Sequence, residues 1–104
     1  MLKILAPFKE KTEVLPLIEA GANVNAQNDS GLTALMMAAM YSDDRTAKLL
    51  IGAHANLEVL DSNQYTALLW AAEYGNITVL RELVAAGANV NHANDEGVTA
   101  LMLA

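Results

Sequence analysis

The chain repeats itself every 33 residues, and this period constrains its fold more than any other feature. The triplet Thr-Ala-Leu occurs three times at this spacing, at 33–35, 66–68 and 99–101. The pentad Gly-Ala-Asn-Val-Asn occurs at 21–25 and 87–91, with an altered copy, His-Ala-Asn-Leu-Glu, at 54–58. A fixed period of this length predicts supersecondary units that stack and bury their apolar faces against one another.

Each copy contains the same local signals. A turn tetrad at 28–31, 61–64 or 94–97 precedes a Thr in the position of a helix N-cap. The apolar spacing then predicts inner helices over 34–40 and 67–74, and outer helices over 44–53 and 77–86. Short turns at Ser42-Asp43 and Gly75-Asn76 separate the two helices of a pair, and Gly87 is expected to be a left-handed C-cap residue.

These motifs resemble the ankyrin repeat, whose pattern has Asp-x-x-Gly-x-Thr-Pro-Leu-His-x-Ala-Ala and Gly-Ala-Asp-Val-Asn at matching positions. The resemblance covers nearly the whole chain. It implies an all-α fold, an α-solenoid of helix-turn-helix units with projecting β-hairpin loops. Residues 1–104 are expected to form one domain, with a partial repeat (1–27), two full repeats (28–60 and 61–93) and a second partial repeat (94–104).

The sequence departs from the family pattern at several positions. Ala replaces the family's Pro at 34, 67 and 100, and an apolar residue replaces its His at 36, 69 and 102. His54 and Gln64 stand where the family has Gly, so both are expected to have positive φ angles.

The first repeat is expected to be degraded. Residues 2–6 match the remnant of an inner helix that Pro7 ends, and Thr12 is a candidate cap for a helix with Pro16 in its first turn. The chain thus begins and ends within expected inner helices, which is consistent with a longer natural protein.

Composition excludes several classes of function. The 104 residues are 54% hydrophobic, which is enough for a core and too much for a disordered chain. No Cys is present, so disulfides, thiolate nucleophiles and Cys-bound zinc are excluded. A net charge of −6 argues against nucleic acid or an anionic membrane as a partner. Without a signal peptide or an apolar run of about 18 residues, a cytoplasmic location is the default expectation.

No constellation of residues predicts catalysis, a cofactor or a metal site. His54 and His92 lie 38 residues apart without a nearby second ligand, so ordinary surface or turn positions explain them better than a metal. Asp43 and Asp44 do not face each other on a helix, and they are expected to stabilise a helix N-terminus. We therefore expect a protein that is not an enzyme.

The large apolar side chains have two possible roles. Met36, Met37, Met40 and Met102 could form an adaptable binding surface, but their spacing favours core positions for all except Met40. Trp70 is likewise expected in the core, with its ring between the two helix layers.

In ankyrin proteins, partners bind a concave face built from hairpin tips and the solvent-facing ends of inner helices. The resemblance transfers this protein-binding role to Asp29, Ser30, Leu32, Met40, Tyr41, Ser62, Asn63, Tyr65, Glu73, Tyr74, Asp95, Glu96 and Val98. The alternative is that polar turn residues serve solubility and that the two helix-end tyrosines merely cover the helix pair.

The distribution of charge sharpens this expectation. No Lys or Arg occurs in a hairpin or a complete inner helix, whereas several Asp and Glu do. The concave face is therefore expected to be acidic and to bind a protein with a basic and apolar patch. A monomer with weak self-association is expected. Two alternatives are a structural segment of a longer array that self-associates through its open ends, and the regulatory domain of an enzyme whose catalytic part lies elsewhere.

Overall fold

The computed structural model describes residues 23–103, which contain five helices. They are α2 (Ala34–Met40), α3 (Asp44–Gly52), α4 (Ala67–Glu73), α5 (Ile77–Ala85) and α6 (Ala100–Leu103). The bounds predicted for α2 through α5 are confirmed to within one residue. The predictions for the first repeat, namely the helix at 2–6, Pro7 as its end, and Thr12 and Pro16 at the next helix, lie outside the described residues.

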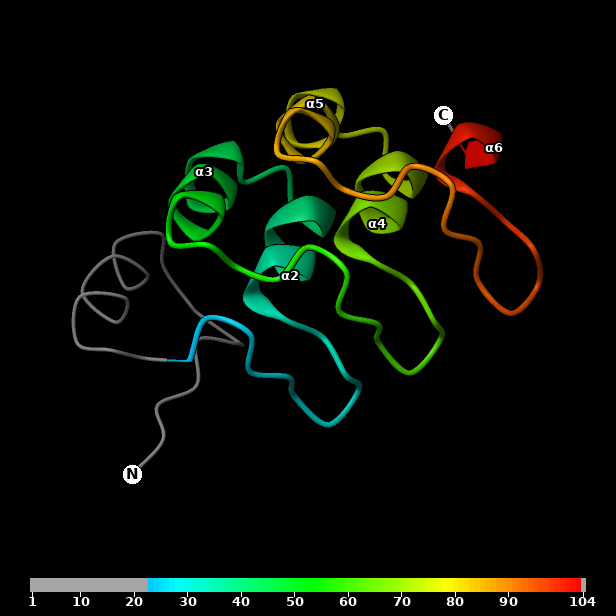
Figure 1. The fold of residues 1–104 in the computed structure, drawn as a ribbon, viewed down its shortest axis with the longest axis horizontal. Coiled ribbons are helices and arrows are strands. Elements are labelled where there is room, and N and C mark those ends of the chain that lie inside the picture. The colour runs from blue at the N-terminus through cyan, green and yellow to red at the C-terminus, as the bar shows by residue number, and fades with distance from the viewer. Residues whose placement is uncertain (1–22, 104) are drawn as a thin grey trace.

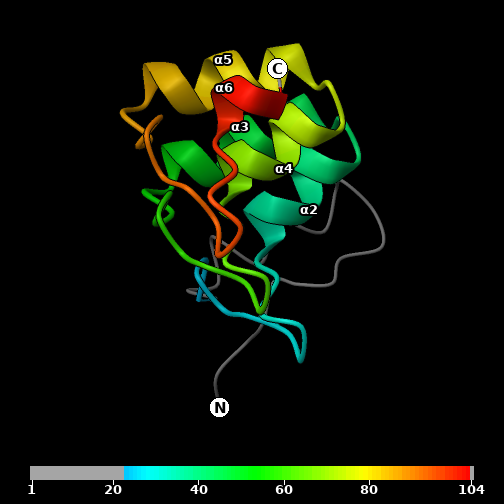
Figure 2. The ribbon, with the colours of Figure 1, turned by 90° about the vertical axis from the view of Figure 1, so that its right-hand side faces the viewer.

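The helices form two layers. The inner helices α2, α4 and α6 follow one another along one layer, and the outer helices α3 and α5 pack beside each other in the second. The long loops that lead into the inner helices project away from both layers in one direction, which Figure 2 shows from the side. The helix pairs follow one another along the long axis of the molecule (Figure 1), which confirms the predicted all-α solenoid.

Side-chain caps fix where the helices begin. Thr33 Oγ1 accepts a hydrogen bond from the Met36 N–H at 3.2 Å, and Thr66 Oγ1 accepts one from the Leu69 N–H at 3.3 Å. Asp43 caps α3 by accepting from the Thr46 N–H at 3.1 Å. These contacts confirm the Thr caps and the role predicted for the Asp pair, since Asp44 lies in the first turn of the same helix.

The core lies between the two layers. Its largest fully buried apolar side chains are Leu35, Met36, Leu50, Leu69, Val79 and Leu83. Met37 is buried as predicted, whereas Met102 is 69% exposed, so its predicted core position is wrong. The physical reason is that, within 23–103, no outer helix packs over α6 as α3 packs over α2.

The prediction that Trp70 bridges the two helix layers is also wrong. Trp70 is half-buried and contacts the edge of the core, and its ring lies against Tyr65 and Tyr74. Its indole N–H bonds to Asp61, the first residue of a hairpin. A buried indole needs such an acceptor, and the interface between the helix layers is apolar.

Three residues that were predicted to have positive φ angles do have them. His54 and Gln64 have φ angles of 63° and 62°, and Gly87 has 95°, as predicted. Ser42, with a φ angle of 57°, was not predicted to be left-handed, although Gly75 stands at the equivalent position of the next repeat.

The projecting loops are short hairpins, and in each one the N–H of the first residue donates to the carbonyl of the fifth. The bonded pairs are Asn28 N to Leu32 O at 3.0 Å, Asp61 N to Tyr65 O at 3.1 Å and Asn94 N to Val98 O at 3.0 Å. Below we call these the first, second and third hairpins (28–32, 61–65 and 94–98). Ala93 and Thr99 form an isolated antiparallel bridge at the base of the third.

Candidate protein-binding surface

The same side-chain contact shapes all three hairpins. A side-chain oxygen of the first hairpin residue accepts hydrogen bonds from the backbone N–H groups two and four residues later, at 2.8–3.0 Å. The accepting residues are Asn28, Asp61 and Asn94. This turn, in which a short polar side chain replaces a backbone acceptor, holds each tip in one conformation.

The second hairpin differs from the others because its first residue is an Asp. Asp61 uses Oδ1 for the turn, and its Oδ2 accepts a hydrogen bond from Trp70 Nε1 at 2.9 Å. Asn has no second acceptor oxygen, so Asn28 and Asn94 could not make this contact. Asp61 therefore connects the second hairpin to α4 and orients the indole ring.

Three aromatic rings form a continuous wall beside this contact. The ring centroids of Tyr65 and Trp70 are 4.6 Å apart with planes tilted by 41°. Those of Trp70 and Tyr74 are 5.8 Å apart and nearly parallel, at 25°. Such offset pairs stabilise the arrangement of the rings beyond the area they bury. We call Tyr65, Trp70 and Tyr74 the aromatic wall.

A carboxylate lies at the edge of the aromatic wall. The Tyr65 hydroxyl donates to Glu73 Oε1 at 3.1 Å. The pKa of Tyr65 is raised above its ordinary value by burial, by this hydrogen bond and by the negative charges of Glu73 and Glu96. Burial is the largest of these causes, and the two negative charges act in the same direction.

The aromatic wall borders a groove of about 370 Å³ between the second hairpin, the third hairpin and α4. Its lining consists of Asn63, Tyr65, Trp70, Glu73, Asn94, Asp95 and Glu96. No Lys or Arg lines it. Arg45, Lys48 and Arg81 are the basic residues of the described part of the chain, and all lie on the outer helices.

The hairpins pack differently on the two sides of the second hairpin. Between the first and second, the Ser62 N–H and hydroxyl both donate to Ser30 O, at 3.1 and 2.8 Å. This approach depends on Gly31, because a Cβ there would lie 2.9 Å from Asp61 Cα. Residues 61–65 and 94–98 share no backbone hydrogen bond, and the position equivalent to Gly31 carries the side chain of Gln64. The groove lies on this more open side.

The structure brings five of the residues predicted to bind protein into this groove: Asn63, Tyr65, Glu73, Asp95 and Glu96. Tyr74 adjoins them through its contact with Trp70 and is 55% exposed. The groove also contains Trp70 and Asn94, which the sequence analysis did not assign to it.

The other predicted residues lie outside the groove. Tyr41 is 73% exposed at the end of α2, and Asp29 is exposed at the first hairpin tip. Leu32 and Met40 are half-buried against the core. The remaining three are Ser30 and Ser62, which bond to each other, and Val98, whose backbone closes the third hairpin.

A signal for Trp70 was present in the sequence. Trp70 and Tyr74 are four residues apart, so they lie on the same helix face, and Tyr74 was already assigned to the surface. The equivalent of Trp70 in the preceding repeat is Met37, which is buried. The apolar character of Trp70 suggested a core position. The signal against it is Asp61, which stands where the other two hairpins have Asn and can accept one more hydrogen bond.

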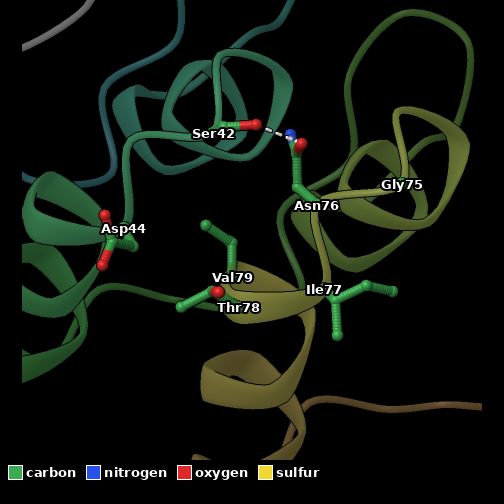
Figure 3. Close-up of a pocket in the computed structure, with 7 residues that line it drawn as sticks. All are labelled: Ser42, Asp44, Gly75, Asn76, Ile77, Thr78 and Val79. Atoms are coloured by element: carbon green, nitrogen blue, oxygen red, sulfur yellow. Dashed lines mark hydrogen bonds between the residues drawn. The ribbon is translucent and has the colours of Figure 1, made fainter.

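A second hollow lies where the helix pairs meet at their turns (Figure 3). The Ser42 hydroxyl donates to Asn76 Oδ1, and Asn76 Nδ2 donates to Ala39 O. The Asn76 side chain thus bridges to the preceding repeat and makes no cap for α5, unlike Asp43 at the start of α3. This contact holds adjacent repeats together.

The described residues contain neither a metal-binding cluster nor a membrane-spanning helix. Among residues 23–103, no three His, Asp or Glu side chains come together in a way that could hold a metal ion. No helix in the same span has both the length and the apolar character needed to cross a membrane.

A family model described as "Ankyrin repeats (3 copies)" matches residues 2–94. No curated protein matches the chain in sequence.

Proposed function

The chain belongs to the ankyrin repeat family, and from this membership we propose that it is a non-enzymatic module that binds a partner protein or peptide. Ankyrin repeats are generally protein–protein interaction modules. The proposed contact surface is the one predicted from the sequence, centred on the groove between the second and third hairpins. The observation that supports this choice is an aromatic wall, with Tyr74 exposed, beside carboxylates that form no salt bridge within residues 23–103.

The aromatic wall has the composition of an interface hot spot. Tyr and Trp contribute most of the binding energy in many protein interfaces, and they do so from positions ringed by polar groups. Tyr74 and Tyr41 expose more than half of their surface to water, and a partner would bury that surface. Truncation of a central Tyr is expected to cost about 2 kcal/mol of binding free energy, mostly through faster dissociation.

The charges of the surface favour a partner with a basic and apolar patch. Asp29, Asp95 and Glu96 are exposed on hairpins. The Lys and Arg residues of the described part of the chain lie on the outer helices α3 and α5. Opposite charges steer a partner toward this face and raise the association rate. Neutralising these acids is expected to slow association, and the effect should vanish at high salt because exposed charges are then screened.

The test is affinity purification with the wild-type chain beside a Tyr65→Ala/Tyr74→Ala variant. A partner identified by mass spectrometry is then purified, and its Kd is measured for both chains and for Arg81→Ala. Arg81 is exposed on α5, so its substitution is expected to change little. If Arg81→Ala abolishes binding while the Tyr substitutions have no effect, the partner sits on the outer helices and the proposed surface is wrong.

A second candidate function is that of a structural segment that self-associates through the end of the solenoid. Leu101 and Met102 are 84% and 69% exposed. Leu101 also lines an apolar groove of about 330 Å³, together with Leu68, Leu80, Val84 and Val90, among others. Light scattering separates the two functions, because a mass that rises with concentration and falls to that of a monomer in Leu101→Ser favours self-association.

We also propose that the repeat boundaries follow the 33-residue period, with full repeats at 28–60 and 61–93 between partial repeats at 1–27 and 94–104. Each full repeat then contributes one hairpin and one helix pair to the surface. Limited proteolysis tests this division, since cuts are expected between units before they occur within a helix pair.

A further inference from the structure

The groove between the second and third hairpins combines two features that each attract a cation. One is the aromatic wall, whose Trp and Tyr rings carry negative potential on their faces. The other is a set of three carboxylates that line the same groove: Glu73 at the edge of the aromatic wall, and Asp95 and Glu96 on the third hairpin. Within residues 23–103 none of these carboxylates forms a salt bridge, because the Lys and Arg side chains of this span lie on α3 and α5.

The position of the aromatic wall is fixed before any ligand arrives. Trp70 Nε1 is already bonded to Asp61 at 2.9 Å, so the indole has no free donor, and its ring is held between Tyr65 and Tyr74. The Tyr65 hydroxyl is held by Glu73 at 3.1 Å. A preorganised surface of this kind loses little side-chain entropy on binding.

The carboxylates are also well placed for a planar cation. Glu73 comes from the end of α4, whereas Asp95 and Glu96 come from the tip of the third hairpin, whose backbone is pinned by Asn94 Oδ1. They therefore approach the groove from two elements. Burial is the main cause of the raised pKa of Tyr65, and the nearby charges of Glu73 and Glu96 add to it.

From this geometry we propose that the groove receives an arginine side chain of the partner, with its guanidinium stacked on the aromatic wall and paired with Glu73 and Glu96. A guanidinium is planar, stacks on aromatic faces and donates hydrogen bonds to carboxylates in a fork. A lysine ammonium is a compact and strongly hydrated charge, which uses a flat aromatic wall less well. This assignment rests on the proposed protein-binding function and specifies the chemistry of its central contact.

The test uses a short peptide, so it does not depend on the identity of the partner. N-acetyl-Leu-Arg-Leu-amide is titrated into the wild-type chain while the indole N–H resonance of Trp70 is followed by NMR; Trp70 is the single Trp of the sequence. Saturable binding is expected. The same peptide with citrulline, which has the shape of arginine without its charge, is expected not to bind, and the lysine peptide is expected to bind on the order of fivefold more weakly.

Charge-removing variants locate the site. Glu73→Gln/Glu96→Gln keeps the shape of both side chains and is expected to weaken the arginine peptide on the order of fivefold or more. Glu58→Gln removes a negative charge from an exposed side chain outside the groove and keeps an acceptor for the Asn89 N–H, and it is expected to leave the affinity unchanged. Circular dichroism of each variant verifies the fold.

Three results would overturn the assignment: equal binding of the citrulline peptide, equal binding of the lysine peptide, or an unchanged affinity in Glu73→Gln/Glu96→Gln. The proposed function fails by a different measurement. If a purified partner is lost with Tyr65→Ala/Tyr74→Ala but binds Glu73→Gln/Glu96→Gln normally, the protein-binding function stands and the arginine contact is wrong.

Discussion

Trp70 Nε1 and Asp61 Oδ2 lie 2.9 Å apart, in a hydrogen bond that links the inner helix α4 to the hairpin preceding it. Asp61 is buried, and its other oxygen accepts from the backbone N–H groups of Asn63 and Tyr65. One carboxylate thus sets both the shape of the second hairpin and the orientation of the aromatic wall.

Asp61→Asn is expected to separate these two roles. The Asn oxygen can keep the turn, as Asn28 and Asn94 do in their hairpins, but its amide would place a donor against the indole N–H. An unsatisfied buried donor costs about 1–3 kcal/mol, so the free energy of unfolding should fall by about that amount in chemical denaturation. A double variant with Trp70→Phe should lose much less on the second substitution, and an additive loss would show that the two residues are not coupled.

Gly31→Ala is expected to be among the most damaging single-methyl changes in the hairpins. The added Cβ would lie 2.9 Å from Asp61 Cα and from Ser62 N, in a residue with a φ angle of +80°. We expect a loss of about 2–4 kcal/mol of unfolding free energy from strain and overpacking together.

Gly97→Ala is the matched control, because Gly97 has a similar φ angle of +78° but no atom within 4 Å of the added Cβ. Its cost should be limited to the backbone term, about 1 kcal/mol. Equal losses for the two variants would mean that the close packing of the first two hairpins contributes nothing to stability.

Gln64→Gly is expected to stabilise the chain. Gln64 has a φ angle of 62°, which Gly adopts freely and other residues adopt at a cost. The unfolding free energy should rise by about 0.5–1 kcal/mol, measured as a higher denaturant midpoint. His54→Gly, with a φ angle of 63° in the native chain, provides an independent case. If both midpoints fall, the greater freedom of Gly in the unfolded chain exceeds the relieved strain.

The repeats could be predicted well from the sequence, because the caps and turns that define each repeat depend on residues close together in the chain. Thr33 and Thr66 cap helices as expected, and the left-handed positions of His54 and Gln64 follow from alignment with Gly alone. The groove could not be predicted in this way. It depends on Trp70, which bonds to a residue nine positions away, and on two hairpins that lie about one repeat apart in sequence. An apolar residue such as Trp70 fits a core position and a surface wall equally well until the partner of its N–H is known.

Glu82 is a position where the chain departs from its own repeat. The equivalent residue in the preceding repeat is Leu49, yet both carboxylate oxygens of Glu82 are buried without a hydrogen-bond partner. Burial raises the pKa of Glu82 above its ordinary value of 4.5; Lys48 opposes this shift and Asp44 adds to it. The folded state therefore favours the protonated form of Glu82. The stability that protonated Glu82 contributes is complete below pH 4.5 and is lost as the pH rises through the raised pKa.

Glu82→Leu is accordingly expected to stabilise the chain at neutral pH by about 1 kcal/mol, because it removes a buried carboxylate with no partner. The gain should shrink as the pH falls through the raised pKa of Glu82 and be smallest below pH 4.5, where wild-type Glu82 is protonated in the folded and the unfolded chain. Denaturant titrations of both chains across this range measure the difference. Asp29→Asn, which removes a charge from an exposed hairpin tip, controls for net charge and should not reproduce the trend. If Glu82→Leu destabilises the chain at neutral pH, the attraction of Lys48 outweighs the cost of burying the carboxylate.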